Sequence, residues 1–294
     1  MTDALPPHFK PLAGEPDPRA QAIGVFDSGV GGLSVLLALR KELPLERFVY
    51  IADSGHAPYG ERHDAHVIDR SRAIARYLVA HHRVKALVVA CNTATAAAIR
   101  LLRQDFPDIP IIGIEPALKP AAALSKTRRI GVMATRGTLQ SEKFSALLAS
   151  LKDQATFILQ PCDGLASAIE RSDAIKTIAS CAYSTRAMGQ FGSDPDNIDT
   201  LVLGCTHYPF ASDELRTLVG DHVTFVECGT PVARQARRLL AANNWLMQEE
   251  LPGVEPVEPA HPIYFGTTGN AQVLQAAALR WLKLDIDAHS LKIN

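Results

Sequence analysis

The segment ALVVACNTAT (residues 86–95) has a counterpart much later in the chain, TLVLGCTHYP (residues 200–209). In each segment an apolar run ends in a small residue, and a cysteine follows, Cys91 in the first and Cys205 in the second. Polar side chains come directly after both cysteines. A short apolar run bounded in this way predicts a buried β-strand that ends just before the cysteine. The same strand-and-cysteine unit is therefore expected twice.

A second landmark repeats in the same order. Ile23-Gly24-Val25 precedes the first cysteine segment, and Ile130-Gly131-Val132 precedes the second. Apolar strands resemble one another by chance, but chance would have to act at both landmarks. The pattern indicates an internal duplication, and hence two similar structural units.

Strand-like and helix-like segments alternate along both halves, which predicts parallel sheets covered by helices. The expected fold is α/β, with two similar parallel-sheet domains related by a pseudo-twofold axis and the active site in the cleft between them. The expected strands lie within residues 21–32, 47–53, 86–93, 109–117, 129–141, 155–162, 197–209, 223–231 and 263–269, the last of these preceding a final helix at 271–282.

Composition narrows the class of protein. The chain has 294 residues, 47% of them hydrophobic, and a formal net charge of −1, so a general attraction to nucleic acid is not indicated. No apolar run approaches the roughly 20 residues that span a bilayer, and no membrane association is expected. Residues 1–20 are polar and Pro-rich without the pattern of a secretory signal, and we expect a flexible N-terminal tail.

The cysteines point to a reduced protein. There are 5, an odd number, with wide spacings and no C-x-x-C pair. This pattern argues against a disulfide framework or a structural zinc site, so no metal is expected and a cytoplasmic location is favoured.

The chemistry follows from where the polar residues stand. Ligands of open parallel sheets bind outside the carboxyl ends of the strands. Several polar residues follow predicted strands directly: Asp27, Ser28, Cys91, Asn92, Thr93, Cys205, Thr206 and His207. If the two halves face each other, the thiols of Cys91 and Cys205 flank one cleft. Two acid–base groups on opposite sides of a carbon atom can remove a proton from one face and return one to the other, as a two-base racemase requires.

Four of the candidate residues have both a functional and an ordinary interpretation. His207 can orient the Cys205 thiol or share its proton, or it can simply cap a helix. Asp27, before the Gly-rich stretch, can assist catalysis or bind a substrate ammonium, or it can act as an N-cap. Tyr59 and Gly60 lie in a loop that can be an ordinary turn or can wall the cleft.

At these residues the chain resembles the glutamate racemases of the cofactor-independent aspartate/glutamate racemase superfamily. The resemblance rests on six segments between residues 23 and 210, with FGTTG near the C-terminus also fitting: GVFDSGVGGLSVL, YIADSGHAPYGER, VVACNTATA, GIEPALKPA, IGVMATRGT and LVLGCTHYPF.

The resemblance implies interconversion of L- and D-glutamate, which supplies D-glutamate for peptidoglycan, without pyridoxal phosphate, metal or nucleotide. It implies that Cys91 and Cys205 are the acid–base catalysts, supported by Asp27 and His207. The substrate-binding residues that it implies are Asp27, Ser28, Tyr59, Gly60, Asn92, Thr93, Thr206 and His207. It also implies a discontinuous first domain, residues 21–117 plus 228–294, with the second domain at 118–227.

Other functions stay open from the sequence. A racemase of the same superfamily acting on aspartate or a hydantoin is the main alternative, although DSGVGG favours glutamate. A decarboxylase of this fold would need only one cysteine, and an amino-acid-binding regulator would need no matched thiols. A homodimer is compatible with the sequence, which does not determine the oligomeric state or the binding of an effector.

Overall fold

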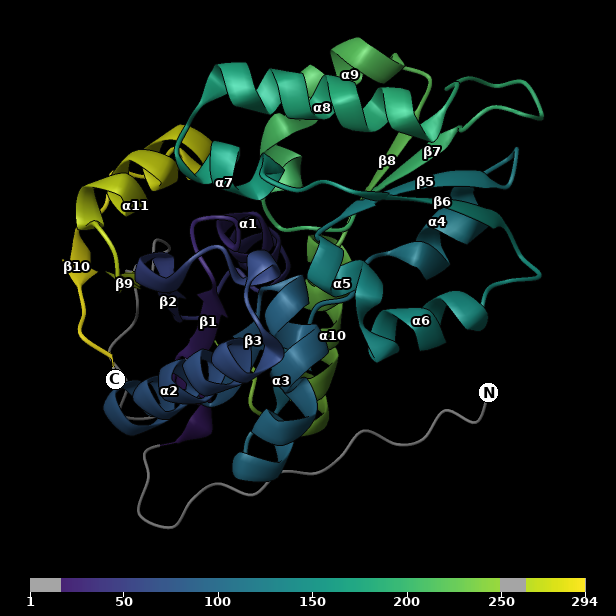
Figure 1. The fold of residues 1–294 in the computed structure, drawn as a ribbon. Coiled ribbons are helices and arrows are strands. Elements are labelled where there is room, and N and C mark those ends of the chain that lie inside the picture. Colours follow the sequence, from purple (N-terminus) through teal and green to yellow (C-terminus); the bar gives the residue numbers. More distant parts are fainter. Residues whose placement is uncertain (1–16, 249–262, 294) are drawn as a thin grey trace.

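Two parallel sheets organise the protein in the computed structural model, which describes residues 17–248 and 263–293 (Figure 1). The first is a 6-stranded sheet in the order β10-β9-β2-β1-β3-β4. Its strands are β1 (Ile23–Asp27), β2 (Phe48–Ala52), β3 (Ala86–Val89), β4 (Ile111–Gly113), β9 (Tyr264–Thr267) and β10 (Ala288–Ser290). β1, β2 and β3 are buried along their whole length, as expected for strands covered by helices on both faces.

The second sheet is 4-stranded, in the order β6-β5-β7-β8. Its strands are β5 (Arg129–Ala134), β6 (Thr156–Pro161), β7 (Thr200–Leu203) and β8 (Thr224–Glu227). The predicted fold class is therefore confirmed: the chain forms two parallel-sheet α/β domains.

The sequence duplication corresponds to a duplication of strand order. β2-β1-β3-β4 in the first sheet has the same arrangement as β6-β5-β7-β8 in the second. The registers agree as well, because Gly24 pairs with Leu87 in one sheet and Gly131 with Leu201 in the other. Cys91 and Cys205 thus follow equivalent strands, β3 and β7. In both sheets the strand order reverses beside these strands, where ligands of open α/β sheets bind.

Helices cover both sheets and connect their strands (Figure 1). The α-helices are α1 (Leu33–Glu42), α2 (Asp64–His82), α3 (Asn92–Asp105), α4 (Leu118–Leu124), α5 (Arg136–Gln140), α6 (Glu142–Ala149), α7 (Leu165–Glu170), α8 (Ala174–Met188), α9 (Ser212–Val219), α10 (Gly229–Ala242) and α11 (Ala271–Ala277). Shorter 3-10 turns occur at Pro18–Ala20, Ser54–His56, Tyr59–Glu61 and Tyr208–Ala211, and Ala278–Leu282 forms a π-helical turn.

The C-terminal part of the chain returns to the first sheet. β9 pairs with β2, and α10 packs along α1. The expectation that the strand within 263–269 is the last one is wrong, because β10 follows it and pairs in parallel with β9. The segment that forms β10 is short and polar, so it lacks the apolar run by which the other strands were recognised.

The domain boundaries and the N-terminal tail were also predicted from the sequence. β5 to β8 lie between the predicted boundaries at 117/118 and 227/228, and the strands of the other sheet lie outside them. The exact residues at which the domains divide stay a proposal. Residues 1–16 of the predicted tail lie outside the described residues, and Pro18–Ala20 form a 3-10 turn.

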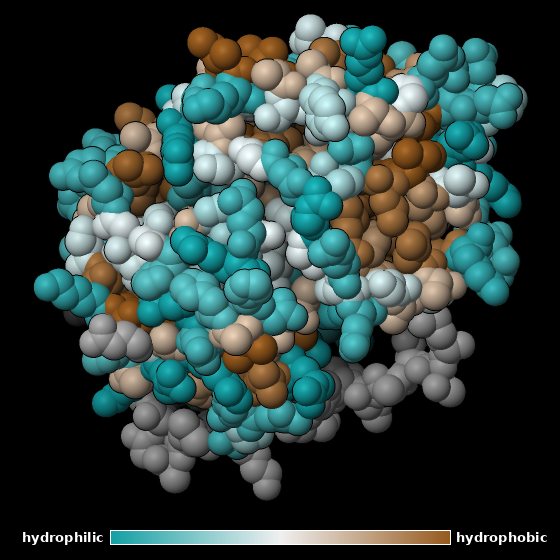
Figure 2. Space-filling model, in the orientation of Figure 1, coloured by the Kyte–Doolittle hydropathy of each residue, from teal (hydrophilic) through white to brown (hydrophobic). Residues whose placement is uncertain are grey.

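The surface is mostly hydrophilic on the face shown in Figure 2, with apolar areas at the top over α8 and at the right. The large apolar side chains exposed on α8 are Ile175, Ile178 and Tyr183. Among residues 17–248 and 263–293, none of the helices is long and apolar enough to cross a bilayer.

Candidate active site

One small cavity brings the two cysteine segments together. Nine of the ten residues expected at the site line it: Ser28, Tyr59, Gly60, Cys91, Asn92, Thr93, Cys205, Thr206 and His207. Its wall also includes residues from the turn after β5 and the loop after β6, among them Thr135, Arg136, Cys162 and Asp163. The free volume is about 30 Å³, room for no more than a water molecule or two.

Cys91 is held at the start of a helix. It is the N-cap of α3, and its sulfur accepts a hydrogen bond from the Ala94 N–H at 3.4 Å. The thiol lies 3.8 Å from the Ser28 hydroxyl. Burial raises the pKa of Cys91 well above its ordinary value, and the negative charge of Asp27 raises it further. Cys91 is therefore held as a protonated thiol, the form that can donate a proton.

Cys205 has a different environment. Its sulfur lies 3.7 Å from Nδ1 of His207, and Nε2 of His207 lies 2.7 Å from a carboxylate oxygen of Glu170. Burial lowers the pKa of His207, but the hydrogen bonds with Cys205 and Glu170 raise it well above its ordinary value. A cationic imidazole beside the Cys205 sulfur stabilises negative charge there by Coulombic attraction. The two faces of the cavity thus differ electrostatically.

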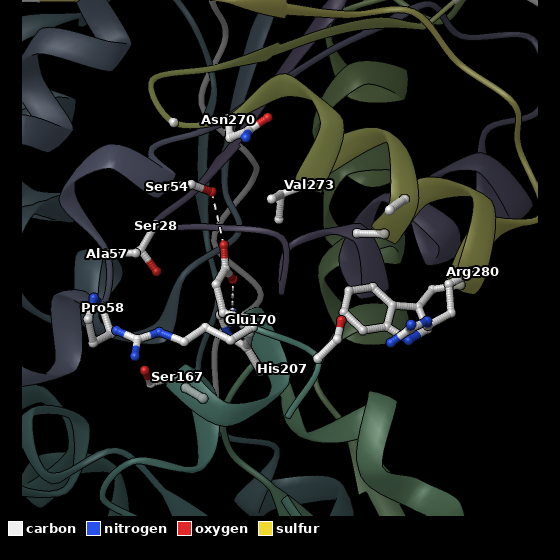
Figure 3. A pocket seen from close by; sticks show the side chains of 17 residues that line it. Ser28, Ser54, Ala57, Pro58, Ser167, Glu170, His207, Asn270, Val273 and Arg280 are labelled. Carbon is white, nitrogen blue, oxygen red and sulfur yellow. Dashed lines mark hydrogen bonds and ion pairs between the residues drawn. The ribbon is translucent and has the colours of Figure 1, made fainter. Parts of the chain in front are cut away.

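Glu170 was not identified from the sequence. It ends α7, next to the second sheet, and its carboxylate accepts the Val30 N–H at 2.9 Å and the Ser54 hydroxyl at 2.9 Å from the first domain. Figure 3 shows this carboxylate between Ser54 and His207. Burial raises the pKa of Glu170, but the hydrogen bond and charge of His207, together with the hydrogen bonds from Val30 and Ser54, lower the pKa overall. No local motif marks Glu170, since its partners are far away in the chain.

A larger cavity of about 500 Å³ lies next to the cysteine cavity. The two share Ser28, Pro58, Ala166 and His207, and Glu170 also lines the larger one. Its far wall is formed by the C-terminal helical segment, including Asn270, Val273 and Arg280 (Figure 3). This space therefore touches a neighbour of each thiol, Ser28 beside Cys91 and His207 beside Cys205.

Asp27 lies beneath the cavity and is fully buried. One carboxylate oxygen accepts the N–H groups of Gly29 and Gly32, both at 3.1 Å, and the Thr206 hydroxyl lies 3.4 Å from the other oxygen. Burial raises the pKa of Asp27 to about 6, and the charge of Glu170 adds to this effect. Asp27 holds the Gly-rich loop in place through these bonds and lies next to the site, but it is not the N-cap of α1, which is Gly32.

Tyr59 is held by a buried ionic network. Its hydroxyl donates to Asp53 at 2.5 Å, and Arg70 forms a bidentate pair with the same carboxylate, with both nitrogen–oxygen distances at 3.0 Å. Asp53 directly follows β2 and is fully buried. Sequence reasoning overlooked Asp53, although an acidic residue directly after a buried strand was a usable signal.

The wall beside Cys91 is closed by contacts between the two domains. The hydroxyl oxygens of Thr93 and Thr135 are 3.1 Å apart. A Cβ atom at Gly60 would lie 2.9 Å from Cβ of Thr135, so the close approach of these segments requires glycine. Asn92 also lines this wall, and both polar atoms of its side chain are buried without a protein partner. An unpaired buried amide is free to bind a polar ligand.

Comparison with known proteins agrees with this geometry. The sequence pattern of the Asp/Glu/hydantoin racemase family matches residues 34–236. Glutamate racemase of Ectopseudomonas mendocina is 46% identical over 257 residues, which cover 86% of this chain and 92% of that protein. The chain belongs to the glutamate racemase family. The Ralstonia pickettii member is 47% identical over 88% of this chain and 87% of its own length.

Solved structures of the family share the fold. Glutamate racemase isoform RacE1 of Bacillus anthracis is 31% identical with a TM-score of 0.79, covering 93% of this chain and 98% of that one. The Escherichia coli glutamate racemase, solved in complex with L-glutamate and the activator UDP-MurNAc-Ala, is 27% identical with a TM-score of 0.78, covering 93% and 99%. Membership of this family makes the chain an amino-acid racemase.

Proposed function

We propose that the protein interconverts L- and D-glutamate by proton transfer between Cys91, Cys205 and the α-carbon. The observation that supports this proposal is the cavity whose wall contains both cysteines, each placed by an equivalent strand of a duplicated sheet. Racemisation needs one base and one acid on opposite faces of the α-carbon, and a duplicated unit supplies such a pair.

The proton balance is simple. With L-glutamate bound, the Cys205 thiolate takes the α-proton and becomes a thiol, while the α-carbon becomes planar and carries the electron pair. The Cys91 thiol then gives its proton to the opposite face, which forms D-glutamate and leaves a Cys91 thiolate. The assignment of Cys205 to L-glutamate and Cys91 to D-glutamate follows the family resemblance. His207 stabilises the Cys205 thiolate, and the raised pKa of Cys91 suits it as proton donor.

The remaining polar residues are proposed to bind the amino acid. Ser28, Tyr59, Gly60, Asn92, Thr93 and Thr206 line the same cavity, and Asp27 supports it from below. The unpartnered amide of Asn92 matches a carboxylate or an ammonium group. Hydrogen bonds from this wall to the bound amino acid then make its α-hydrogen more acidic. The proposal includes no cofactor or metal.

The biological setting is part of the proposal. D-Glutamate serves peptidoglycan synthesis, and hence cell-wall biogenesis and cell shape. The mechanism needs both thiols reduced, which favours the cytoplasm. A homodimer is also possible under this proposal, and the exposed apolar side chains of α8 offer one surface for it. Sedimentation velocity measures the oligomeric state directly.

Circular dichroism tests the proposal. L-Glutamate incubated with the protein after dialysis against a chelator should lose its optical activity completely, and D-glutamate should do the same. L-Aspartate in parallel measures specificity within the superfamily. Cys181→Ala is the matched control, because Cys181 is a buried cysteine of α8 that does not line the cavity. An unchanged signal with glutamate, or a rate that returns only with pyridoxal phosphate or zinc, would refute the proposal.

A further inference from the structure

The cysteine cavity opens to solvent through a charged rim. Most residues in its wall are buried or half-buried, and the exposed ones are Glu61, Arg136, Asp163 and Gly164. Since these are the exposed residues of the wall, we take the mouth of the cavity to lie among them. Glu61 belongs to the first domain, next to Tyr59 and Gly60, whereas Arg136 and Asp163 stand on the second. Any substrate that reaches the cysteines by this route passes between them.

An ion pair occupies the second-domain side of this rim. Arg136, the first residue of α5, donates through Nη2 to a carboxylate oxygen of Asp163, which lies in the loop between β6 and α7. Both side chains are about half exposed, 52% and 53%. An exposed pair of this kind contributes little to stability, typically about 0–1 kcal/mol, because water and salt screen it. The pair can therefore exchange partners at small cost.

The rim is unfavourable to an anion without Arg136. Glu61 and Asp163 are acidic, and the fully buried Asp27 lies beneath the cavity. Among the described residues lining the cavity, Arg136 is the one Arg or Lys side chain, and the other basic group, His207, is buried and paired with Glu170. Glutamate carries two carboxylates and a net charge of −1 at neutral pH, so it meets mostly like charge on the way to the cysteines.

We propose that Arg136 captures the anionic substrate at the mouth of the cavity by exchanging the carboxylate of Asp163 for a carboxylate of the amino acid. The inference rests on the proposed function, since it takes the substrate to be an acidic amino acid. A guanidinium suits this exchange because its planar set of donors binds carboxylates in a bidentate manner. In this arrangement Asp163 competes with the substrate and holds Arg136 at the rim between turnovers.

The two partners of the pair then have opposite effects, which separates capture from a structural role. Arg136→Gln should lower kcat/KM for glutamate about three- to tenfold and weaken its dependence on ionic strength, with kcat little changed. Asp163→Asn removes the competing carboxylate and should raise kcat/KM about two- to fivefold at low salt. Arg136→Lys keeps the charge and should recover most of the loss. L- and D-glutamate have equal free energies, so each variant must change kcat/KM equally in both directions.

A matched control lies elsewhere on the first domain. Arg72 of α2 and Asp105 of α3 form another partly exposed pair, 33% and 32% exposed, and neither lines the cavity. Arg72→Gln should leave kcat/KM and its salt dependence unchanged. The inference is overturned if Arg136→Gln equals the wild type, or if Asp163→Asn fails to raise kcat/KM. A wild-type protein that does not racemise glutamate would instead refute the proposed function, so the two failures are distinguishable.

Discussion

The two thiols of the site are chemically unequal. Cys91 has hydrogen-bonding neighbours without formal charge, the Ala94 N–H and the Ser28 hydroxyl, whereas Cys205 faces the His207–Glu170 pair. Burial and the charge of Asp27 thus favour the thiol form of Cys91, whereas a cationic imidazole lies beside the sulfur of Cys205. The two half-reactions therefore begin from different surroundings, although racemisation in both directions requires each cysteine to act in turn as base and as acid.

Replacing one cysteine should separate the two half-reactions. Cys205→Ala should abolish net racemisation in both directions, lowering the rate by about 10²–10⁴-fold or more, because the proton donor on one face is gone. The remaining Cys91 still faces D-glutamate, so this variant should exchange the α-hydrogen of D-glutamate in heavy water with retention, but slowly, because Cys91 must first lose its proton. Cys91→Ala should show the reverse preference for L-glutamate. Proton NMR in deuterium oxide measures both exchange rates.

Two results would contradict this assignment. Exchange of the opposite enantiomer by either variant would show that the faces are interchanged. Near-wild-type racemisation by Cys91→Ala or Cys205→Ala would exclude the two-thiol mechanism. Cys181→Ala, which leaves the cavity untouched, provides the reference rate.

Glu170 should act through His207. Glu170→Gln retains an oxygen that accepts the Val30 and Ser54 hydrogen bonds but removes the negative charge that helps to raise the pKa of His207. His207 then loses its proton at a lower pH than in the wild type. If the cationic form supports Cys205, the alkaline limb of kcat/KM should move to lower pH, and kcat should fall about 10²-fold.

A pH profile of kcat/KM from mildly acidic to alkaline conditions checks this shift. Glu170→Asp, which restores the charge on a shorter side chain, should recover part of the alkaline limb. An unchanged limb in Glu170→Gln would mean that Glu170 has only a packing role.

Among the secondary-structure elements, the 3-10 turn Tyr59–Glu61 and α5 form a close contact beside the cavity. Gly60 belongs to the first domain, and Thr135 is the N-cap of α5 in the second. The missing side chain of Gly60 lets the turn lie directly on Thr135, with Thr93 hydrogen-bonded to the same residue. The wall next to Cys91 therefore depends on the spacing of two elements rather than on one side chain.

Gly60→Ala should disturb this spacing. The added Cβ would lie 2.9 Å from Cβ of Thr135, so the turn and α5 must move apart. We expect kcat/KM for glutamate to fall about tenfold, mainly through KM, because a small displacement of positioning groups is costly. Steady-state kinetics in both directions measure the effect.

Gly137→Ala is the matched control for this substitution. It lies in α5 on the same contact, but its added Cβ would meet the Gly60 carbonyl oxygen at 3.5 Å, an ordinary contact distance. Its kinetics should stay close to those of the wild type. Equal losses in both variants would show that any methyl group in this region is harmful, and that the Gly60–Thr135 approach is not special.

In the molecule as a whole, contacts between the domains lie on both sides of the cavity. Thr93 and Thr135 meet on the Cys91 side, and Glu170 reaches Val30 and Ser54 on the Cys205 side. The enclosed volume of about 30 Å³ does not hold an amino acid of the size of glutamate. We therefore expect the domains to separate when the substrate enters and the product leaves.

Locking the domains together should stop turnover. The hydroxyl oxygens of Thr93 and Thr135 are 3.1 Å apart, so cysteines at both positions bring two sulfurs within reach of a disulfide. After oxidation the Thr93→Cys/Thr135→Cys variant should lose racemisation, and reduction should restore it to the level of the reduced double variant. Wild type and the two single variants, oxidised in the same way, control for damage to Cys91 and Cys205. Full activity of the cross-linked protein would show that opening on this side is unnecessary.

Much of this organisation was predictable from local patterns. Apolar runs bounded by polar residues identified β1, β2, β3 and β7, because strands buried on both faces need continuous apolar sequence. The repeated Ile-Gly-Val and cysteine landmarks anticipated the matching registers of the two sheets. Since parallel strands place their carboxyl ends at one edge, the residues that follow them were also predictable as a group.

Other features depend on contacts between distant parts of the chain. Glu170 lies 140 residues from Val30 and 37 from His207, and nothing near it in the sequence marks the helix end that brings it to the site. Thr135 meets Thr93 only because the two domains approach each other. β10, short and polar, becomes a strand because β9 offers it an open edge. Hydrophobic periodicity is a property of short stretches of sequence, so it predicts which segments are buried. The partner of a polar group depends on how elements far apart in the chain pack together, so a local pattern does not predict it.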